Sequence, residues 1–532
     1  MLSRRMHRLL LVALLVGCAG SPPPPVPPAP VHLQLLAFND FHGNLEPPSG
    51  TVRLADGTVP AGGASWLSAH LAHLRAQEPN TLVVAAGDLI GASPLASALE
   101  RDEPSIAAMD ALGLDVSSVG NHEFDRGVDE LRRLQKSARF TYLAGNVIDT
   151  QTGQTVFPGS VLKRVDGATV GLVGVVLKDT PQVVRPEGIR GLRFIDEAEA
   201  VNAAVPKLRA AGADVVVVLI HQGGATARGS PPNSCQDLAG PITEIVPRFH
   251  DVDVVVSGHT HHAYLCPDLG GTLVTQAGAF GRFLTRILLT IDPAHHRVVE
   301  KVATQVPVTH DLPPDPTVAR IVDQAVSDAA PLARRRVGRL AAALSRGQNA
   351  SGEAPLGDVV ADAQLAATAR SASATVAFTN PGGLRTDLPA GALSYGQAFA
   401  AQPFGNTLVT LSLSAGQLRS LLEQQWTGTS QTKILQPSAN VSYAWSESAP
   451  KGTKLVPGSL RVDGRLLDAK SKVRVTVNSF LASGGDGFSV LTEGTERVGG
   501  PSDLDALVDY LKPTLEGPPL PAPTGGRIHK AP

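Results

Sequence analysis

The stretch Gly120-Asn121-His122-Glu123-Phe124-Asp125 follows a short β-prone run, Val116 to Val119, that is typical of a buried strand. Three side chains of different chemistry therefore stand where a strand gives way to a loop. Asn121 offers a neutral oxygen to a metal, and His122 can donate a proton near neutral pH. Asp125 lies three residues further on, where its carboxylate can orient that imidazole. Taken alone, the stretch is also compatible with ordinary loop polarity.

Four other stretches share this design of a strand followed directly by Asp, Asn or His. They are Asn39-Asp40-Phe41-His42, Ala86-Gly87-Asp88, Ile220-His221-Gln222-Gly223 and Ser257-Gly258-His259-Thr260-His261. Strand ends of this kind converge at one edge of an α/β sheet, where ligands bind. Carboxylate and amide oxygens with imidazole nitrogens suit Zn, Mn, Fe or Co. One ion needs fewer ligands, so two ions about 3.5–4 Å apart, bridged by a carboxylate, would use the set and clamp a phosphoryl group.

The surrounding chain predicts an α/β fold. Short β-branched runs alternate with Ala- and Leu-rich helical stretches such as Trp66–Gln77 and Ala198–Ala211, which indicates a layered sheet covered on both faces. The predicted strands are Leu33–Phe38, Leu82–Ala86, Val170–Val176, Val215–Ile220 and Val252–Val256, with later and more antiparallel strands at Leu273–Thr275 and Phe283–Ile291. A helix over about Thr317–Ala333 is expected to link this domain to a second one of α+β pattern.

The predicted boundaries follow from these patterns and from Pro-rich breaks. They are a signal peptide at 1–17, a Pro-rich linker at 18–31, a first domain at 32–306, an interdomain helix at 307–336, a second domain at 337–516 and a disordered tail at 517–532. The chain has 532 residues, 43% of them hydrophobic, which is ample for two full cores. The net charge is -2 and Lys and Arg form no long runs, which argues against a nucleic-acid polymer as partner.

The N-terminus has the pattern of an export signal. Arg4, Arg5 and Arg8 precede an apolar core from Leu9 to Val16 that is too short to span a bilayer. Gly17 and Cys18 follow this core, in a pattern that resembles a bacterial lipoprotein box; an ordinary secretory signal with a chance cysteine is the alternative. We therefore expect an exported lipoprotein, in the outer membrane and periplasm or on the cell surface, anchored by a lipid on Cys18.

The other two cysteines are an even pair in an oxidising compartment. Cys235 and Cys266 both lie in loops of the same half of the chain, and we predict a disulfide between them. Two buried free thiols are the alternative.

Polar, Gly-rich loops of the second domain suggest a substrate site. They are Asn380-Pro381-Gly382-Gly383-Leu384-Arg385, Gln402-Pro403-Phe404-Gly405-Asn406 and the longer run from Asn478 through Phe480 and Asp486 to Phe488. Two Phe in loops could sandwich a planar base, since stacking is worth about 1–3 kcal/mol per base. Simple packing into the core is the alternative for either ring. With metals on one domain and base recognition on the other, a cleft between the domains is expected.

The metal stretches resemble those of calcineurin-like binuclear metallophosphoesterases. From about Leu33 to Leu511 the chain resembles the bacterial 5′-nucleotidase and UDP-sugar hydrolase family. This resemblance implies an N-terminal four-layer α/β metallophosphoesterase domain with a second α+β substrate-binding domain, and two divalent metal ions of the Zn, Mn or Co class. By resemblance, Asp40, His42 and His261 bind one metal, Asn121, His221 and His259 bind the other, and Asp88 bridges them.

The resemblance also assigns the remaining site residues. His122 and Asp125 match the catalytic dyad, Phe404 and Phe480 stack on the base, Asp486 holds ribose hydroxyls, Asn380 lies by the substrate, and Arg385 reaches phosphate. A further phosphate-binding Arg usually stands just before a Glu-x-x-Leu-Gly helix start. Here Arg346 lies seven residues before Glu353, so it would fill that role from a longer loop.

The function implied is hydrolysis of nucleoside 5′-monophosphates to nucleoside and phosphate outside the cytoplasm, by a metal-activated water. Alternatives with the same metals are a 2′,3′-cyclic-nucleotide phosphodiesterase with 3′-nucleotidase activity, a UDP-sugar hydrolase and a thiosulfohydrolase. A non-enzymatic alternative is a surface-anchored binding protein on an inactive phosphoesterase scaffold. The expected partners are a nucleotide substrate and, through the lipid anchor, a membrane; no obligate protein partner is predicted.

Overall fold

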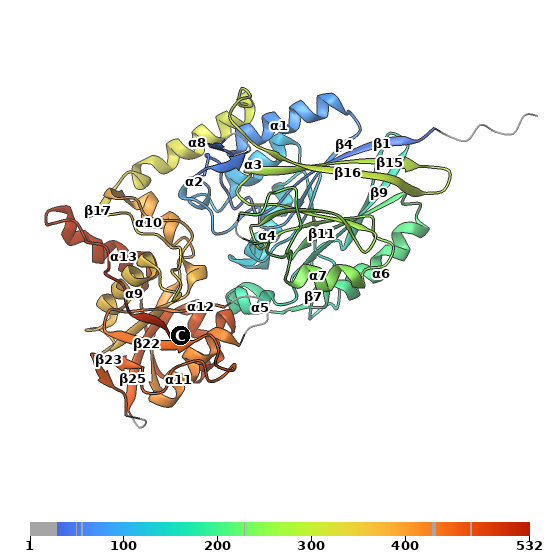
Figure 1. Ribbon diagram of the computed structural model, residues 1–532. Coiled ribbons are helices and arrows are strands. Elements are labelled where there is room, and N and C mark those ends of the chain that lie inside the picture. Colours follow the sequence, from blue (N-terminus) through green and yellow to red (C-terminus); the bar gives the residue numbers. More distant parts are fainter. Residues whose placement is uncertain are drawn as a thin grey trace, which may run out of the picture.

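The computed structural model describes residues 29–48, 50–54, 57–227, 229–427, 432–468 and 471–531. The predicted signal peptide, Cys18 and most of the Pro-rich linker lie outside the described residues. Two domains follow each other along the chain, and α8 (Pro316–Ala333) runs from the first toward the second (Figure 1). The predicted interdomain helix is therefore present at nearly its predicted position.

Two six-stranded sheets form the centre of the first domain. One has the strand order β16-β15-β1-β4-β5-β6 and the other β13-β14-β12-β11-β9-β8. The first contains β1 (Val31–Phe38), β4 (Thr81–Ala86), β5 (Val116–Ser118), β6 (Thr141–Leu143), β15 (Phe283–Asp292) and β16 (Arg297–Pro307). The second contains β8 (Ser160–Val165), β9 (Ala168–Val176), β11 (Val215–His221), β12 (Val254–Ser257), β13 (Ala263–Leu269) and β14 (Thr272–Ala277).

Apolar side chains from both sheets meet in one core. Leu35 and Val84 of the first sheet share this core with Leu172 and Val217 of the second. The outer face of the first sheet packs on α1 (Ala64–Gln77), α3 (Glu103–Leu112) and α8, and that of the second on α6 (Glu197–Ala210) and α7 (Pro241–Ile245). The predicted four-layer α/β domain is confirmed.

The central strands of each sheet run parallel, so their carboxyl ends lie at one edge. β1, β4, β5 and β6 are parallel neighbours, as are β9, β11, β12 and β14. β15 pairs antiparallel with β1, as predicted. The expectation of a more antiparallel strand was only half right for β14, which is antiparallel to β13 but parallel to β12.

The second domain is built on a mixed sheet of order β21-β18-β25-β20-β26. Its strands are β18 (Val376–Thr379), β20 (Thr407–Ser414), β21 (Gln436–Pro437), β25 (Lys472–Asn478) and β26 (Thr495–Ser502). α11 (Ala415–Glu423) packs on the face that carries Val475, while α9 (Pro355–Thr368) bonds through Thr368 to Thr476, the next residue along β25. Since neighbouring strand residues point to opposite faces, these helices cover opposite sides of the sheet. α13 (Asp503–Leu511) packs beside α9.

The prediction of a disordered tail at 517–532 was wrong. β27 (Ile528–Ala531) pairs in parallel with β22 (Val441–Ser446), and Ile528 is buried. The Arg527 guanidinium donates to Asp362 at 2.8 and 2.9 Å and lies 3.6 Å from Asp358. The Pro- and Gly-rich composition did not reveal that this segment is ordered. Its order depends on acidic partners that lie far earlier in the chain.

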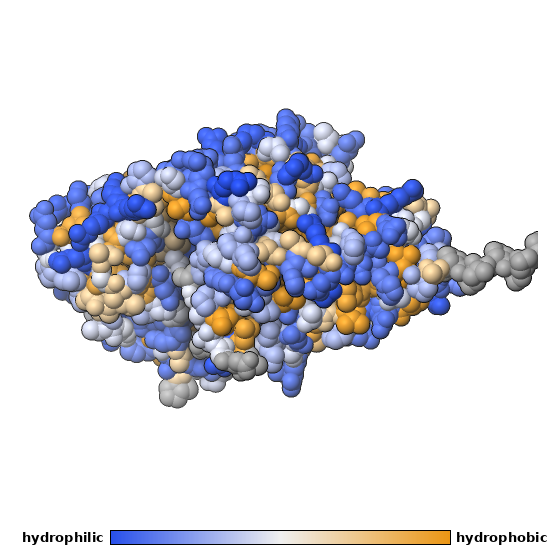
Figure 2. Space-filling model, turned by 90° about the horizontal axis from the view of Figure 1, so that it is seen from above, coloured by the Kyte–Doolittle hydropathy of each residue, from blue (hydrophilic) through white to orange (hydrophobic). Residues whose placement is uncertain are grey.

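Polar residues cover much of the face shown in Figure 2, and apolar residues gather there only in small groups. Within the described part of the chain, no helix combines the length and the apolar character needed to cross a bilayer.

We predict that Arg527→Ala strongly destabilises the second domain. The substitution leaves the mostly buried carboxylate of Asp362 without its counter-charge, and breaking one side of such a pair costs about 3–5 kcal/mol. It also removes the positive charge beside Asp358, although burial already raises the pKa of that group to about 8. Urea unfolding followed by far-UV circular dichroism measures this loss. Lys530→Ala is the matched control in the same strand, because its partner Glu447 is exposed and the expected cost is about 1 kcal/mol or less. Equal losses in the two variants would contradict the prediction.

Candidate active site

Predicted metal ligands lie at the carboxyl ends of parallel strands in both sheets. Asp40 stands two residues after β1, Asp88 two after β4, and Asn121 three after β5. In the second sheet, His221 is the last residue of β11 and His259 stands two residues after β12. The two sheets are stacked, so these five chain segments meet at one place.

The ligand atoms converge to within a few ångströms. Asp88 Oδ2 lies 3.0 Å from His221 Nε2 and 3.6 Å from His42 Nε2. His261 Nε2 lies 3.3 Å from Asp40 Oδ1 and 3.1 Å from His42 Nε2. His259 Nδ1 lies 3.0 Å from the side-chain oxygen of Asn121. Three groups could each hold a metal ion: Asp40 with His42 and His261, His42 with Asp88 and His122, and Asp88 with His221 and His259.

The hydrogen bonds of the imidazoles fit a divalent cation. His221 Nδ1 lies 2.7 Å from the carbonyl of Ala86, and His42 Nδ1 lies 2.9 Å from the carbonyl of Gly91. A carbonyl only accepts, so Nδ1 of each ring carries a proton and Nε2 is the nitrogen that is left to bind a metal ion. Both Nε2 atoms face the carboxylate of Asp88. A buried carboxylate that is surrounded by imidazole nitrogens needs a positive charge beside it, which either a metal ion or a second ring proton supplies.

The electrostatics of His221 point the same way. Burial disfavours the charged ring, but the adjacent Asp88 carboxylate raises the pKa of His221 to about 10. The position between the two residues therefore attracts a cation, whether a proton or a metal ion.

Backbone strain is concentrated at the same residues. Asp40, His42, Asp88, His259 and His261 have φ angles of 48°, 49°, 50°, 76° and 60°. Non-glycine residues in this left-handed region each cost about 1–3 kcal/mol and cluster at functional sites. The fold therefore tolerates strain in order to aim these side chains.

Two glycines make the close approach of the strand ends possible. A Cβ on Gly120 would lie 2.2 Å from Asp88 Oδ1, and one on Gly258 would lie 2.9 Å from His221 Nδ1. Because both contacts are far below van der Waals distance, any larger residue at either position would displace a metal ligand.

His122 and Asp125 form the predicted dyad. His122 Nδ1 lies 2.8 Å from Asp125 Oδ2, and the backbone N–H of His122 donates to Asp88 Oδ1 at 2.9 Å. Burial favours the neutral ring, but the carboxylates of Asp125 and Asp88 raise the pKa of His122 above its ordinary value. The ring is therefore suited to carry a proton near neutral pH.

Glu123 is a site residue whose role the sequence did not reveal. Its buried carboxylate accepts the backbone N–H of Asp88 at 2.9 Å, of Leu89 at 2.8 Å and of Gly120 at 2.5 Å. It thereby ties the loop after β4 to the loop after β5 and positions Asp88. The only signal was an acidic residue between His122 and Asp125.

A cavity of ≈ 270 Å³ lies between the two domains beside these residues. The first domain contributes Asn121, His122, Asp125, Arg185 and His259, and the second contributes Asn380, Arg385, Phe404, Lys433, Asn478, Phe480 and Asp486, among others. The Phe404 ring stacks on the His122 ring with centroids 5.6 Å apart. The structure thus brings the dyad together with five of the six predicted substrate residues, and it contains the expected interdomain cleft.

Arg346, the sixth predicted substrate residue, lies outside this cavity. It is exposed and lines a neighbouring cavity of ≈ 490 Å³, which it shares with Arg385. Arg385 borders both cavities. The longer loop therefore places Arg346 in the cavity that adjoins Arg385 and not in the one that the two Phe rings line.

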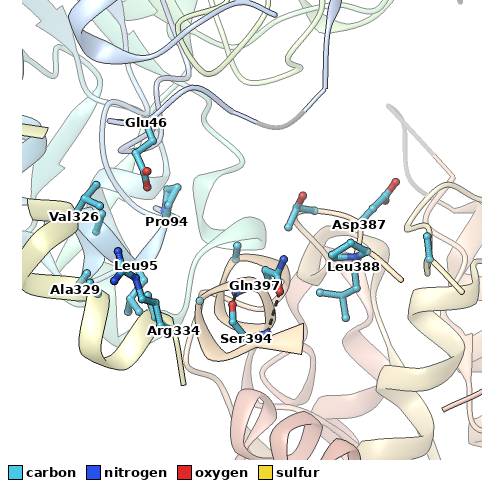
Figure 3. Close-up of a pocket in the computed structure, with 18 residues that line it drawn as sticks. Glu46, Pro94, Leu95, Val326, Ala329, Arg334, Asp387, Leu388, Ser394 and Gln397 are labelled. Atoms are coloured by element: carbon cyan, nitrogen blue, oxygen red, sulfur yellow. Dashed lines mark hydrogen bonds between the residues drawn. The ribbon is translucent and has the colours of Figure 1, made fainter. Parts of the chain in front are cut away.

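A larger cavity, of ≈ 890 Å³, is a separate feature of the domain boundary (Figure 3). α2 (Leu95–Ala98), α8 and α10 (Tyr395–Ala401) contribute to its walls, which carry many small or apolar side chains such as Ala329 and Leu388. None of the predicted ligands or substrate residues is among its lining residues. The volume of a cavity alone would therefore not have identified the candidate active site.

The predicted pairing of the two remaining cysteines is present. Cys235 and Cys266 form a disulfide with their Cα atoms 5.1 Å apart. It ties the loop before α7 to β13 at the rim of the second sheet.

Comparison with known proteins finds a family match for each of the two domains. Residues 33–263 match the model of the calcineurin-like phosphoesterases, and residues 334–493 match that of the 5′-nucleotidase C-terminal domain. Endonuclease YhcR of Bacillus subtilis is 30% identical over 521 residues, and the alignment covers 94% of this chain but only 41% of that protein. A probable 5′-nucleotidase of Treponema pallidum is 25% identical over 598 residues, with 96% of each chain covered.

A solved structure shows the same two-domain arrangement. The 5′-nucleotidase precursor from Thermus thermophilus has a TM-score of 0.80 and 28% identity, and the match covers 94% of this chain and 99% of that one. Calcineurin-like phosphoesterases use divalent metals, which agrees with the clusters described above. From its two matched domains and its strand-end ligands, this chain belongs to the 5′-nucleotidase family of calcineurin-like metallophosphoesterases, and it is a hydrolase.

Proposed function

We propose that the protein hydrolyses nucleoside 5′-monophosphates to nucleoside and phosphate. The observation that supports this best is the shared interdomain cavity. One wall carries the His122–Asp125 dyad beside the metal ligands, and the other carries Phe404, Phe480 and Asp486. Its volume of ≈ 270 Å³ is near the lower end of usual ligand pockets, about 300–1,000 Å³. A phosphate, a ribose and a base would each meet groups of matching chemistry there.

The metal ligands divide into two sets that share one carboxylate. Asp40, His42 and His261 would hold one divalent cation, Asn121, His221 and His259 would hold a second, and Asp88 would serve both. Bound there, two cations would supply Lewis acidity that activates water and offsets the charge of the phosphoryl group.

The protein side chains supply the rest of the chemistry. His122, protonated and held by Asp125, donates its Nε2 proton to the ribose oxygen as that oxygen leaves phosphorus. Arg385 faces the same space with a guanidinium suited to phosphate. Phe404 and Phe480 provide aromatic faces for the base, which fixes the leaving group in position.

Three other substrates remain chemically related candidates. A 2′,3′-cyclic nucleotide or a UDP-sugar would use the same metals and the same aromatic pair, whereas a small sulfur oxyanion would leave Phe404 and Phe480 without a role. An inactive binding scaffold would be expected to lack metal ligands, yet all seven predicted ones are close together here.

We also propose that the reaction takes place outside the cytoplasm. This rests on the export signal with Cys18 in the sequence and on the disulfide between Cys235 and Cys266, a bond typical of oxidising compartments.

A substrate panel tests the proposed function. Purified protein with Mn²⁺ or Zn²⁺ is expected to release phosphate from AMP and UMP, and more slowly from 2′,3′-cyclic AMP and UDP-glucose. A chelator should abolish the release. Intact cells that make the protein should hydrolyse AMP supplied outside. Release of phosphate from the cyclic nucleotide alone or from UDP-glucose alone would refute the proposed substrate in favour of that alternative. Hydrolysis of AMP only after the cells are lysed would refute the proposed location.

Two variants serve as controls in that panel. His122→Ala is expected to lower kcat about 10²–10⁴-fold, the usual contribution of a general acid, with no loss of bound metal. His250→Ala alters an exposed histidine that does not line the cavity and should match the parent. A His122→Ala protein with the parent rate would remove the assigned role.

The dyad predicts a specific change in pH dependence. Because the carboxylate of Asp125 raises the pKa of His122, it keeps the ring protonated to higher pH. Asp125→Asn removes that charge, so the pKa of His122 should fall and the alkaline limb of the kcat profile should move to lower pH. Steady-state kinetics from about pH 5 to about pH 10 would show the shift, because that range brackets the ordinary pKa of histidine. An alkaline limb that stays in place would contradict the pairing.

A further inference from the structure

We propose that Asp503 of the second domain is a positioning residue for the catalytic dyad. It reaches the dyad by two routes across the domain boundary, one through Asn406 and Phe404 and the other through Arg185 of the first domain. The inference rests on the proposed function and goes beyond it, because Asp503, Asn406 and Arg185 have no part in the chemistry proposed above.

The first route ends at the contact between the Phe404 ring and the His122 ring. Their planes are 19° apart and their centroids 5.6 Å apart, so the two rings are stacked. The hydrogen bond between His122 Nδ1 and Asp125 Oδ2 fixes one atom of the imidazole but leaves the ring free to tilt about that bond. A nearly parallel aromatic face removes this freedom and so sets the direction in which Nε2 presents its proton. A misplacement of about 1 Å can lower a rate about 100-fold.

Phe404 stands on a short loop whose far end is held by Asp503. The loop joins α10 to β20, and Gly405, with φ 60°, allows it to turn. The next residue, Asn406, donates from Nδ2 to Asp503 Oδ2 at 3.3 Å, and its backbone carbonyl accepts the N–H of Asp503 at 2.8 Å. Both Asn406 and Asp503 are buried. The position of the Phe404 ring therefore depends on two hydrogen bonds to one acidic residue.

The second route runs through Arg185, which follows α5 (Thr180–Val183) in the first domain. α5 lies against Gly485–Gly487 of the second domain (Figure 1). Arg185 lines the shared cavity and donates to the backbone carbonyl of Asp125 at 3.4 Å. Burial raises the pKa of Asp503 to about 7, and the positive charge of Arg185 acts against that rise. Arg185 therefore interacts both with the backbone of the dyad and with the buried acid of the other domain.

Capping of α13 does not account for a buried acid at this position. Ser502 already caps the helix, because its side chain accepts the N–H of Asp505. An acid that only complemented the helix dipole could do so while exposed to solvent, without the cost of burial. A link to the dyad gives a reason for burying Asp503.

The test separates protonation of the leaving group from the other requirements of the reaction. It compares AMP with its 5′-thio analogue, in which sulfur replaces the oxygen between phosphorus and the ribose carbon. A thiolate leaves without a proton, so the analogue keeps the base and the sugar but does not need the acid. For Asp503→Ala we expect kcat to fall about ten- to hundredfold with AMP and to stay within about threefold with the analogue. A merely structural role would lower both rates alike.

Arg185→Met tests the second route from the first domain, and it remains informative if Asp503→Ala does not fold. It should lower the ratio of kcat for AMP to kcat for the analogue about threefold or more. The double variant should lose no more than Asp503→Ala alone, because that change already breaks both routes. Asp505→Ala is the matched control, since Asp505 is exposed in the first turn of the same helix and does not line the cavity. It should behave as the parent.

The ratio of the two kcat values decides the outcome. A ratio equal to that of the parent in either folded variant, Asp503→Ala or Arg185→Met, would overturn the inference, whether or not the absolute rates fall. Absence of phosphate release from AMP and from the analogue by the parent would instead refute the proposed function.

Discussion

Two buried carboxylates and several imidazole nitrogens lie close together where the two sheets of the first domain meet. The structure depends on a positive charge that offsets the repulsion among these groups. The carboxylates of Asp40 and Asp88 are almost fully buried, and the imidazoles of His42 and His221 turn their Nε2 atoms toward Asp88. Burying a carboxylate without a counter-charge costs several kcal/mol. Divalent cations bound between these side chains would relieve that cost and would supply the chemistry proposed for the site.

The convergence of the predicted metal ligands also accounts for the strained backbone of the loops and for what each domain contributes to the site. Left-handed backbone at the ligands and glycine at positions 120 and 258 are needed only because five strand ends must approach one point. The second domain brings none of the seven predicted metal ligands. It brings Phe404 onto His122 and lines the shared cavity with polar side chains. The two domains therefore contribute different kinds of side chain to one cavity.

Much of this could be predicted from the sequence, because the informative residues interrupt regular patterns. Asp88 and His221 stand out as polar residues at the ends of β-branched runs, and that pattern predicts both strand and ligand. The roles of Glu123 and Arg527 could not be predicted in this way. Each role depends on contacts with partners 34 and 165 residues away, respectively, which no local pattern reveals. Composition even misled at the segment after residue 517, whose Pro and Gly content hides an ordered strand.

The account depends most directly on the number of metal ions. Protein purified with Mn²⁺ or Zn²⁺ and freed of loosely bound ions can be measured by inductively coupled plasma mass spectrometry. The account predicts two equivalents of transition metal per chain for the parent and one or none for Asp88→Asn, since Asp88 would serve both ions. A parent protein that retains no transition metal after incubation with either ion would contradict it.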